Sequence, residues 1–345
     1  MKRIISAALA FVLLLAPVFA PVSSAAAPTD ADRLLSDFVS ALCGGSDNAA
    51  VEAYLGSISA DAGTTPTDWF FITLRSLRPG IVCPGYASAL GSFDASSENA
   101  VYRQRVALAQ VYAGDPSGTA AVVNETAGQL GVMSNIWALI LADSCLATGV
   151  DRRQIVSDIL GAALPTGGWA LFGSGADVDV TSMALTALSP YAGLDAGVKS
   201  AVDTTLGMLS ARQNADGSFS SMGAANCEST AQVLMALSSL GIDALKDARF
   251  IKNKNTVVSA IAAYSDGTGL FCHTAGGGTD QNASAQAFYA LCAYRMLETG
   301  EGRFFEPYGA PTEDILNGTE SDASFLRACG RLYRLIIRMI AALTF

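Results

Sequence analysis

The segment WALFGSGADVDVTSMALTALSPY (residues 169–191) has two relatives further along the chain, FSSMGAANCESTAQVLMALSSL (219–240) and FCHTAGGGTDQNASAQAFYALCAYRML (271–297). Each starts at an aromatic residue, crosses a glycine-containing loop to a polar or acidic residue, has Thr or Ser two places later, and ends as an apolar segment containing Ala-Leu. The aligned positions Asp179, Glu228 and Asn282 are 49 and 54 residues apart. Such a period fits two helices and two turns, and therefore predicts an array of stacked helical hairpins.

Two kinds of helix alternate along the sequence. One kind has apolar residues at steps of three and four with polar residues between them, which indicates a single buried face; these helices are 30–42, 102–113, 151–164, 196–213 and 255–264. The other kind is apolar on nearly every side and should be buried on both flanks; these are 68–77, 134–146, 179–188, 228–240 and 282–297. The alternation predicts an all-α fold of two concentric rings, a parallel inner ring inside an antiparallel outer one.

The N-terminus indicates export. Lys2 and Arg3 precede an apolar run that Pro17 interrupts, and small residues follow up to position 27, which is the pattern of a cleaved secretory signal peptide (1–27). The run is shorter than the ~20 residues of a membrane-spanning helix. The formal net charge is −10, and loss of Lys2 and Arg3 makes it more negative still. An acidic surface of this kind repels nucleic acid, so we expect no nucleic-acid partner.

The cysteines do not form the dense pattern of a disulfide scaffold. They are odd in number and widely spaced, at Cys43, Cys83, Cys145, Cys227, Cys272, Cys292 and Cys329. Cys227 and Cys272 occupy equivalent loops of neighbouring repeats. They are therefore the first pair to test for a bridge in an oxidising compartment.

The residues that open the apolar helices have two interpretations. Asp179, Glu228 and Asn282 stand in a first turn, where unpaired N–H groups favour acidic or amide side chains, so they are expected to start the helices. Alternatively, inner helices that all begin on one face bring polar groups to the mouth of a central cavity above Trp137, Met183 and Met235, which is the usual form of a small-molecule site. The candidate ligand-binding residues are Asp177, Asp179, Thr181, Glu228, Thr230, Gln232, Asn282 and Gln286.

Three segments, QNADGSFS (213–220), CESTAQVLMALSSLGID (227–243) and DVDVTSMALTALSPY (177–191), resemble the prenyltransferase and squalene-cyclase type repeat of the alpha/alpha toroid superfamily. That superfamily includes terpenoid cyclases, protein prenyltransferase beta subunits and the helical domain of cobalamin carriers such as intrinsic factor and transcobalamin. The resemblance is clear over residues 150–300 and fainter over 30–150. It implies an alpha/alpha toroid of the α6/α6 type and leaves the activity open.

The cyclase branch implies a general acid. Class II terpene cyclases protonate an alkene with the middle Asp of Asp-x-Asp-Asp-Thr, which requires a protonated carboxyl in an apolar cavity. Asp177, Asp179 and Thr181 match that motif, whereas Val180 replaces its last Asp. Asp179 is accordingly the candidate catalytic residue, and the incomplete motif favours a protein that is not an enzyme.

The other two branches imply a cofactor. Prenyltransferases hold zinc through Asp, Cys and His; here Cys227, Cys272 and His273 are the candidate ligands, but no Asp-x-Cys accompanies them. Cobalamin carriers close over a corrinoid with a second, β-rich domain, and the segment after residue 305 is too short for one. We therefore predict neither zinc nor corrinoid as a cofactor.

The C-terminal segment 326–345 is predicted to form a basic amphipathic helix. Its arginines recur at steps of four, three and four and so form one stripe, made of Arg327, Arg331, Arg334 and Arg338. Such a helix either lies on an anionic membrane surface or packs its apolar arc on the toroid.

The sequence thus predicts a signal peptide (1–27), an alpha/alpha toroid (28–310), a linker (311–325) and the C-terminal helix. Its expected function is that of a secreted or cell-surface module that binds a small apolar or amphipathic ligand or a partner protein. The alternative is an enzyme of the cyclase or prenyltransferase type that uses Asp179 as general acid.

Overall fold

The computed structural model describes residues 30–318, and this part of the chain is helical apart from one short hairpin. The predicted all-α class is therefore confirmed. Strands β1 (Phe219–Ser221) and β2 (Ala224–Asn226) pair antiparallel with Phe219 opposite Asn226. The predicted signal peptide, the end of the predicted linker, Cys329 and the segment predicted to form the arginine-bearing C-terminal helix lie outside the described residues.

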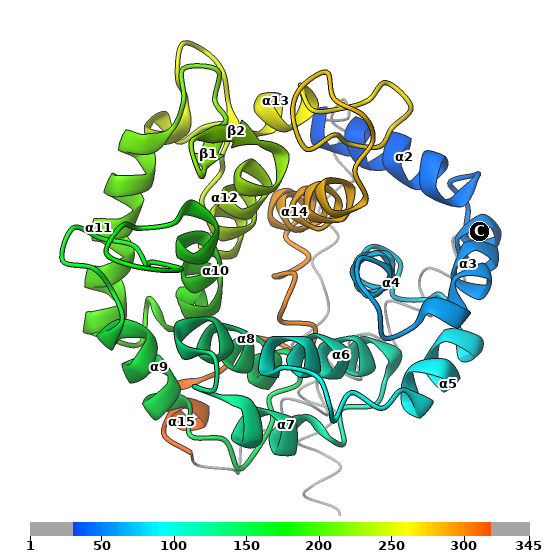
Figure 1. Cartoon of the computed structure of the whole chain (residues 1–345), viewed down its shortest axis with the longest axis horizontal. Coiled ribbons are helices and arrows are strands. Elements are labelled where there is room, and N and C mark those ends of the chain that lie inside the picture. The colour runs from blue at the N-terminus through cyan, green and yellow to red at the C-terminus, as the bar shows by residue number, and fades with distance from the viewer. Residues whose placement is uncertain (1–29, 319–345) are drawn as a thin grey trace, which may run out of the picture.

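Six helices form an inner circle (Figure 1). They are α4 (Thr67–Leu77), α6 (Ala100–Ala113), α8 (Gly131–Ser144), α10 (Val178–Leu188), α12 (Cys227–Ser239) and α14 (Gln281–Thr299). Each packs on the next along the chain, and α14 packs on α4. Their C-terminal ends share one side, because residues 303–306 reach the ends of all six.

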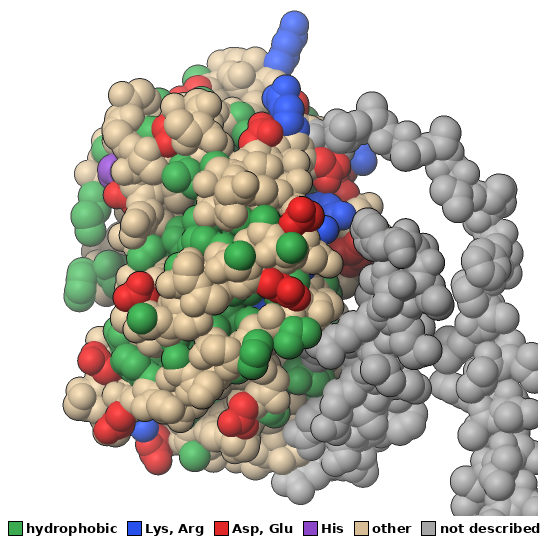
Figure 2. All heavy atoms as spheres, turned by 90° about the vertical axis from the view of Figure 1, so that its right-hand side faces the viewer, with side chains coloured by type: hydrophobic (Ala, Val, Ile, Leu, Met, Phe, Trp, Pro, Cys, Tyr) green, Lys and Arg blue, Asp and Glu red, His purple; other side chains and the backbone are tan. Residues whose placement is uncertain are grey.

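The remaining helices lie outside this circle (Figure 1). They are α2 (Asp30–Cys43), α3 (Asn48–Ser57), α5 (Pro84–Ser92), α7 (Thr119–Thr126), α9 (Arg152–Gly161), α11 (Ala196–Arg212), α13 (Val257–Ala262) and α15 (Glu313–Leu316). On the side of the molecule shown in Figure 2, many acidic side chains lie apart from one another among apolar and neutral ones, and others lie next to basic side chains at the upper right.

Helix α6 differs from the prediction, which placed residues 102–113 among the one-sided outer helices. It lies in the inner circle between α4 and α8. Its polar residues are buried and paired: Gln104 donates to Thr126 Oγ1 and to the Ser134 carbonyl, both at 2.9 Å, and Arg105 forms an ion pair with Asp68. A paired polar residue inside a protein has the same sequence signature as an exposed one, so periodicity alone misassigned this helix.

The repeat has a clear physical basis in the loop before each of the last three inner helices. The aromatic residues Trp169, Phe219 and Phe271 are completely buried. The backbone N–H of each donates to the hydroxyl group on the following helix, Thr181, Thr230 and Ser284, at 2.9, 3.1 and 3.0 Å respectively. Since a buried N–H requires a partner, the Thr or Ser of each repeat holds its loop against its helix.

Aromatic side chains fill the middle of the inner circle. Trp69 and Trp137 have ring centroids 5.4 Å apart, and Phe305 packs edge-on against Trp137 at 6.1 Å. Phe304 and Phe305 reach this position because the segment after α14 turns back across the C-terminal ends of the inner helices (Figure 1). The ring interior is thus a packed aromatic core at this level.

The start of the predicted linker is ordered. Residues Ile315 and Leu316 of α15 are buried, and Ile315 packs with Leu146 and Tyr308.

Within residues 30–318, no helix is both long and apolar enough to cross a membrane.

Candidate functional site

The N-terminal ends of the inner helices are capped two residues before the positions expected to start them. Asp177 accepts from the N–H groups of Asp179 and Val180 at 2.9 and 3.0 Å, and Asp280 accepts from those of Asn282 and Ala283 at 2.8 and 2.9 Å. Asn226 does the same for Ser229 on α12. Asp179, Glu228 and Asn282 therefore stand in the first turns, as predicted, but the expectation that their side chains cap the helices is wrong.

The predicted cavity-mouth residues separate into distinct groups. Thr181 and Thr230 are buried and hold their loops, so they do not face a ligand site. Gln232 and Gln286 do meet: Gln232 Nε2 donates to Gln286 Oε1 at 2.8 Å and also to the Tyr289 hydroxyl. Asn282 is exposed at the first turn of α14.

Asp179 has an unusual environment. Its Oδ1 atom is buried without a hydrogen-bond partner among the described residues. Burial raises the pKa of this carboxyl to about 6, with a further upward contribution from the charges of Asp177 and Glu228 and an opposing one from the Ser229 hydroxyl. A carboxyl of this kind is partly protonated near neutral pH, as a general acid must be.

Glu228 is paired with the chain's single histidine. His273 Nδ1 lies 2.8 Å from Glu228 Oε2, and this hydrogen bond raises the pKa of His273. Cys227 and Cys272 are buried free thiols, so the bridge suggested for them is not formed in this structure. Burial raises the pKa of both thiols, which opposes the thiolate that zinc requires. Over residues 30–318, no three His, Cys, Asp or Glu side chains meet in an arrangement that could hold a metal.

The wall predicted for a central cavity is tightly packed. Trp137 lies against Trp69 and Phe305, and Met235 is buried. Met183 is partly buried against the same core. The aromatic contacts thus occupy the space below the N-terminal polar residues where a ligand was expected.

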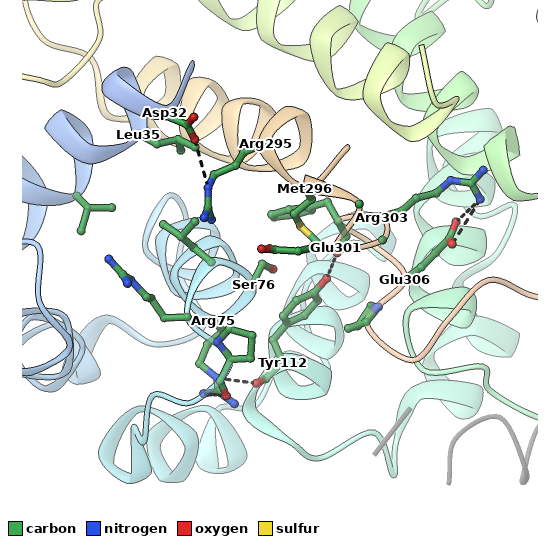
Figure 3. Close-up of a pocket in the computed structure, with 18 of the residues that line it drawn as sticks. Asp32, Leu35, Arg75, Ser76, Tyr112, Arg295, Met296, Glu301, Arg303 and Glu306 are labelled. Carbon is green, nitrogen blue, oxygen red and sulfur yellow. Dashed lines mark hydrogen bonds and ion pairs between the residues drawn. The ribbon is translucent and has the colours of Figure 1, made fainter. Parts of the chain in front are cut away.

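A large hollow lies at the opposite end, between α2, the C-terminal ends of α4, α6 and α14, and the segment 300–309 (Figure 3). Its volume is about 840 Å³, within the range of sites for drug-sized molecules. We call it the C-terminal cavity. Its lining includes the apolar residues Leu35, Val39, Leu77, Met296 and Phe304 and the charged residues Asp32, Arg75, Arg78, Arg295, Glu301, Arg303 and Glu306.

Several of these charges are held by neighbouring groups. Asp32 Oδ1 lies 3.3 Å from Arg295 Nε, and Arg303 lies 3.2 Å from Glu306 (Figure 3). Arg75 donates from Nε to the Tyr112 carbonyl at 3.2 Å, and the Tyr112 hydroxyl donates to the Phe304 carbonyl at 2.5 Å. These bonds join α4 to α6 and α6 to the segment 300–309, so the cavity has fixed walls.

Sequence reasoning missed this cavity because it searched the helix starts. One signal was available: Arg75 and Arg78 fall at the end of the inner helix α4, in a chain with few basic residues. Cations are favoured at helix C-termini, which alone explains one arginine per helix but not two at the end of α4.

Comparisons with protein-family models, with curated proteins and with solved structures find no significant match to this chain.

Proposed function

We propose that this protein is an exported alpha/alpha toroid that acts as a small-molecule-binding module, secreted or at the cell surface, and that its ligand occupies the C-terminal cavity. The toroid assignment is supported by the sequence repeat, its recurring loop anchors and the circle of inner helices that α14 and α4 close. Export is supported by the signal-peptide pattern of residues 1–27.

The observation that carries the binding function is the C-terminal cavity itself. It combines apolar walls, formed by Leu35, Val39 and Met296, with several charged side chains in a hollow of about 840 Å³. Concave sites that are mostly apolar and contain a few placed polar groups are typical of small-molecule binding.

One observation favours a second candidate, an enzyme of the cyclase type. The pKa of Asp179 is raised to about 6, mainly by burial, as the general-acid role requires. The packed Trp69, Trp137 and Phe305 rings stand against it, since a cyclase needs room for an extended hydrocarbon beside its acid. The binding module is therefore the better-supported function.

Native mass spectrometry of the full mature protein, purified from its own host, tests the binding function. We expect a co-purified small molecule that is lost from Ser36→Trp, because Ser36 is an exposed residue of α2 that lines the cavity and the indole would fill it. Ser200→Trp, at an exposed position of α11 away from the cavity, is the matched control. A ligand retained by Ser36→Trp would place binding elsewhere, and a ligand-free wild-type protein would contradict the proposal.

A further inference from the structure

Arg78 presents an incompletely bonded guanidinium at the C-terminal cavity. Its Nη2 donates to the Ser46 carbonyl at 3.0 Å, whereas its Nε is buried and has no partner in the described part of the chain. A guanidinium has five N–H donors in a planar fork. The Ser46 carbonyl uses one of these donors, so the terminal nitrogens keep N–H groups for an acceptor that a ligand brings.

The charges around the cavity favour an anion. Four arginines line it against three carboxylates, those of Asp32, Glu301 and Glu306. Asp32 is paired with Arg295 and Glu306 with Arg303. The third carboxylate, Glu301, belongs to an exposed residue, so water weakens its repulsion of a bound anion. Arg78 lies on the same side at the end of α4, beside Arg75, whose guanidinium donates to the backbone carbonyls of Tyr112, Pro79 and Ile81.

An apolar wall faces this positive side. Leu35 and Val39 are buried, one turn apart on α2, and Met296 comes from α14 (Figure 3). A ligand that reaches both sides must be amphipathic. Methionine adapts its shape to different apolar partners, so this wall suits a flexible hydrocarbon chain.

From these contacts we infer that the C-terminal cavity binds an amphipathic carboxylate, with its head group at Arg78 and Arg75 and its hydrocarbon part against Leu35, Val39 and Met296. The inference rests on the proposed function and adds the class of ligand to it. A carboxylate matches the guanidinium fork geometrically, and its oxygens can accept from the terminal nitrogens of Arg78 at the cavity.

The first test compares three probes with the same eight-carbon chain on the full mature protein at pH 7. Isothermal titration with octanoate, octanol and octylamine should give the tightest binding for octanoate, weaker binding for octanol and the weakest for octylamine. Equal binding of octanoate and octanol, tighter binding of octylamine, or no binding of octanoate would overturn the carboxylate assignment. These results do not depend on whether mass spectrometry finds a bound ligand. The carboxylate assignment can therefore be wrong while the proposed binding function is right.

The second test identifies the residue. Arg78→Gln should weaken octanoate about tenfold or more, as loss of a charge-assisted hydrogen bond does, and leave octanol unchanged. Arg78→Lys keeps the charge but loses the fork, so we expect an intermediate value. Arg33→Gln removes an exposed positive charge from α2 outside the cavity and should bind octanoate as wild type does. An unchanged octanoate affinity in Arg78→Gln would overturn the role of Arg78; if that variant does not fold, the three-probe comparison decides alone.

Discussion

The charged form of the Asp179 carboxylate destabilises the folded protein. This carboxyl is buried at the first turn of α10 beside Asp177 and near Glu228, and its pKa is raised from 3.8 to about 6. Between these two values the folded protein holds a proton that the unfolded chain has released. The free energy of unfolding therefore falls as pH rises through this range and stays lower above pH 6.

Replacing Asp179 by Asn should stabilise the protein at neutral pH. The amide has nearly the same shape and no charge, so the gain at pH 7.5 is expected to be about 1 to 3 kcal/mol, whereas at pH 4 the two proteins should be nearly equal. Urea unfolding of both proteins at the two pH values measures the difference. The same stabilisation at pH 4 and pH 7.5 would refute the raised pKa as its cause.

At the residue scale, sequence reasoning located the polar positions but not their roles. The repeat aligned Asp179, Glu228 and Asn282 correctly, yet the caps are Asp177, Asn226 and Asp280. Which of two nearby polar residues caps a helix depends on the backbone angles where the loop ends. The spacing of side chains does not contain that information.

At the scale of the elements, glycines let the loops of the repeat pack closely on neighbouring outer segments. Gly167, Gly217 and Gly269 each precede the anchoring aromatic residue by two positions, and all have positive φ, of +90°, +87° and +107°. At Gly217 an added Cβ would lie 2.6 Å from the Thr256 carbonyl oxygen, and at Gly269 one would lie 2.6 Å from that of Asp37. The chain therefore needs glycine here for close contact with the neighbouring outer segment as well as for the turn.

Gly217→Ala should lower the free energy of unfolding by more than about 2 kcal/mol, because the left-handed conformation alone disfavours a side chain by 1–2 kcal/mol and the backbone contact adds to it. Gly207 offers a matched control, since it lies in the middle of α11 and an added Cβ meets nothing within 4 Å. Gly207→Ala should raise stability by up to about 1 kcal/mol. Chemical denaturation of both variants checks the pair, and equal effects would contradict the role given to Gly217.

Element boundaries followed from the sequence wherever a helix was amphipathic or uniformly apolar, as for α11 and α12. The prediction failed for α6 because Gln104 and Arg105 are buried with partners on other elements. It also missed α3, α5 and α7, whose short segments carry no strong periodicity. Contacts made across the fold, rather than local pattern, placed these helices.

At the scale of the whole molecule, the first and last parts of the described chain depend on each other. Helix α2 packs on α14, and the Phe38 ring stacks on Phe288 with centroids 4.2 Å apart and on Phe271 at 6.0 Å. The repeat predicted a stack of hairpins, but the segment before residue 150 shows the repeat only faintly. The contacts between α2 and α14 involve the part of the chain where the repeat is faint, and no aligned motif there predicts them.

Phe38→Ala should therefore weaken the packing of both α2 and α14. Phe38 is completely buried, so the substitution should lower the free energy of unfolding by about 3 to 5 kcal/mol. Hydrogen exchange should show faster exchange in α14 as well as in α2, since the ring loses the contact that holds them together. Phe172→Ala is the matched control: its side chain is 83% exposed, and its removal should change stability by no more than about 0.5 kcal/mol. If α2 alone loses protection in Phe38→Ala while α14 keeps it, the inner helices form a unit that is stable without α2, and the packing of α2 is not what stabilises α14.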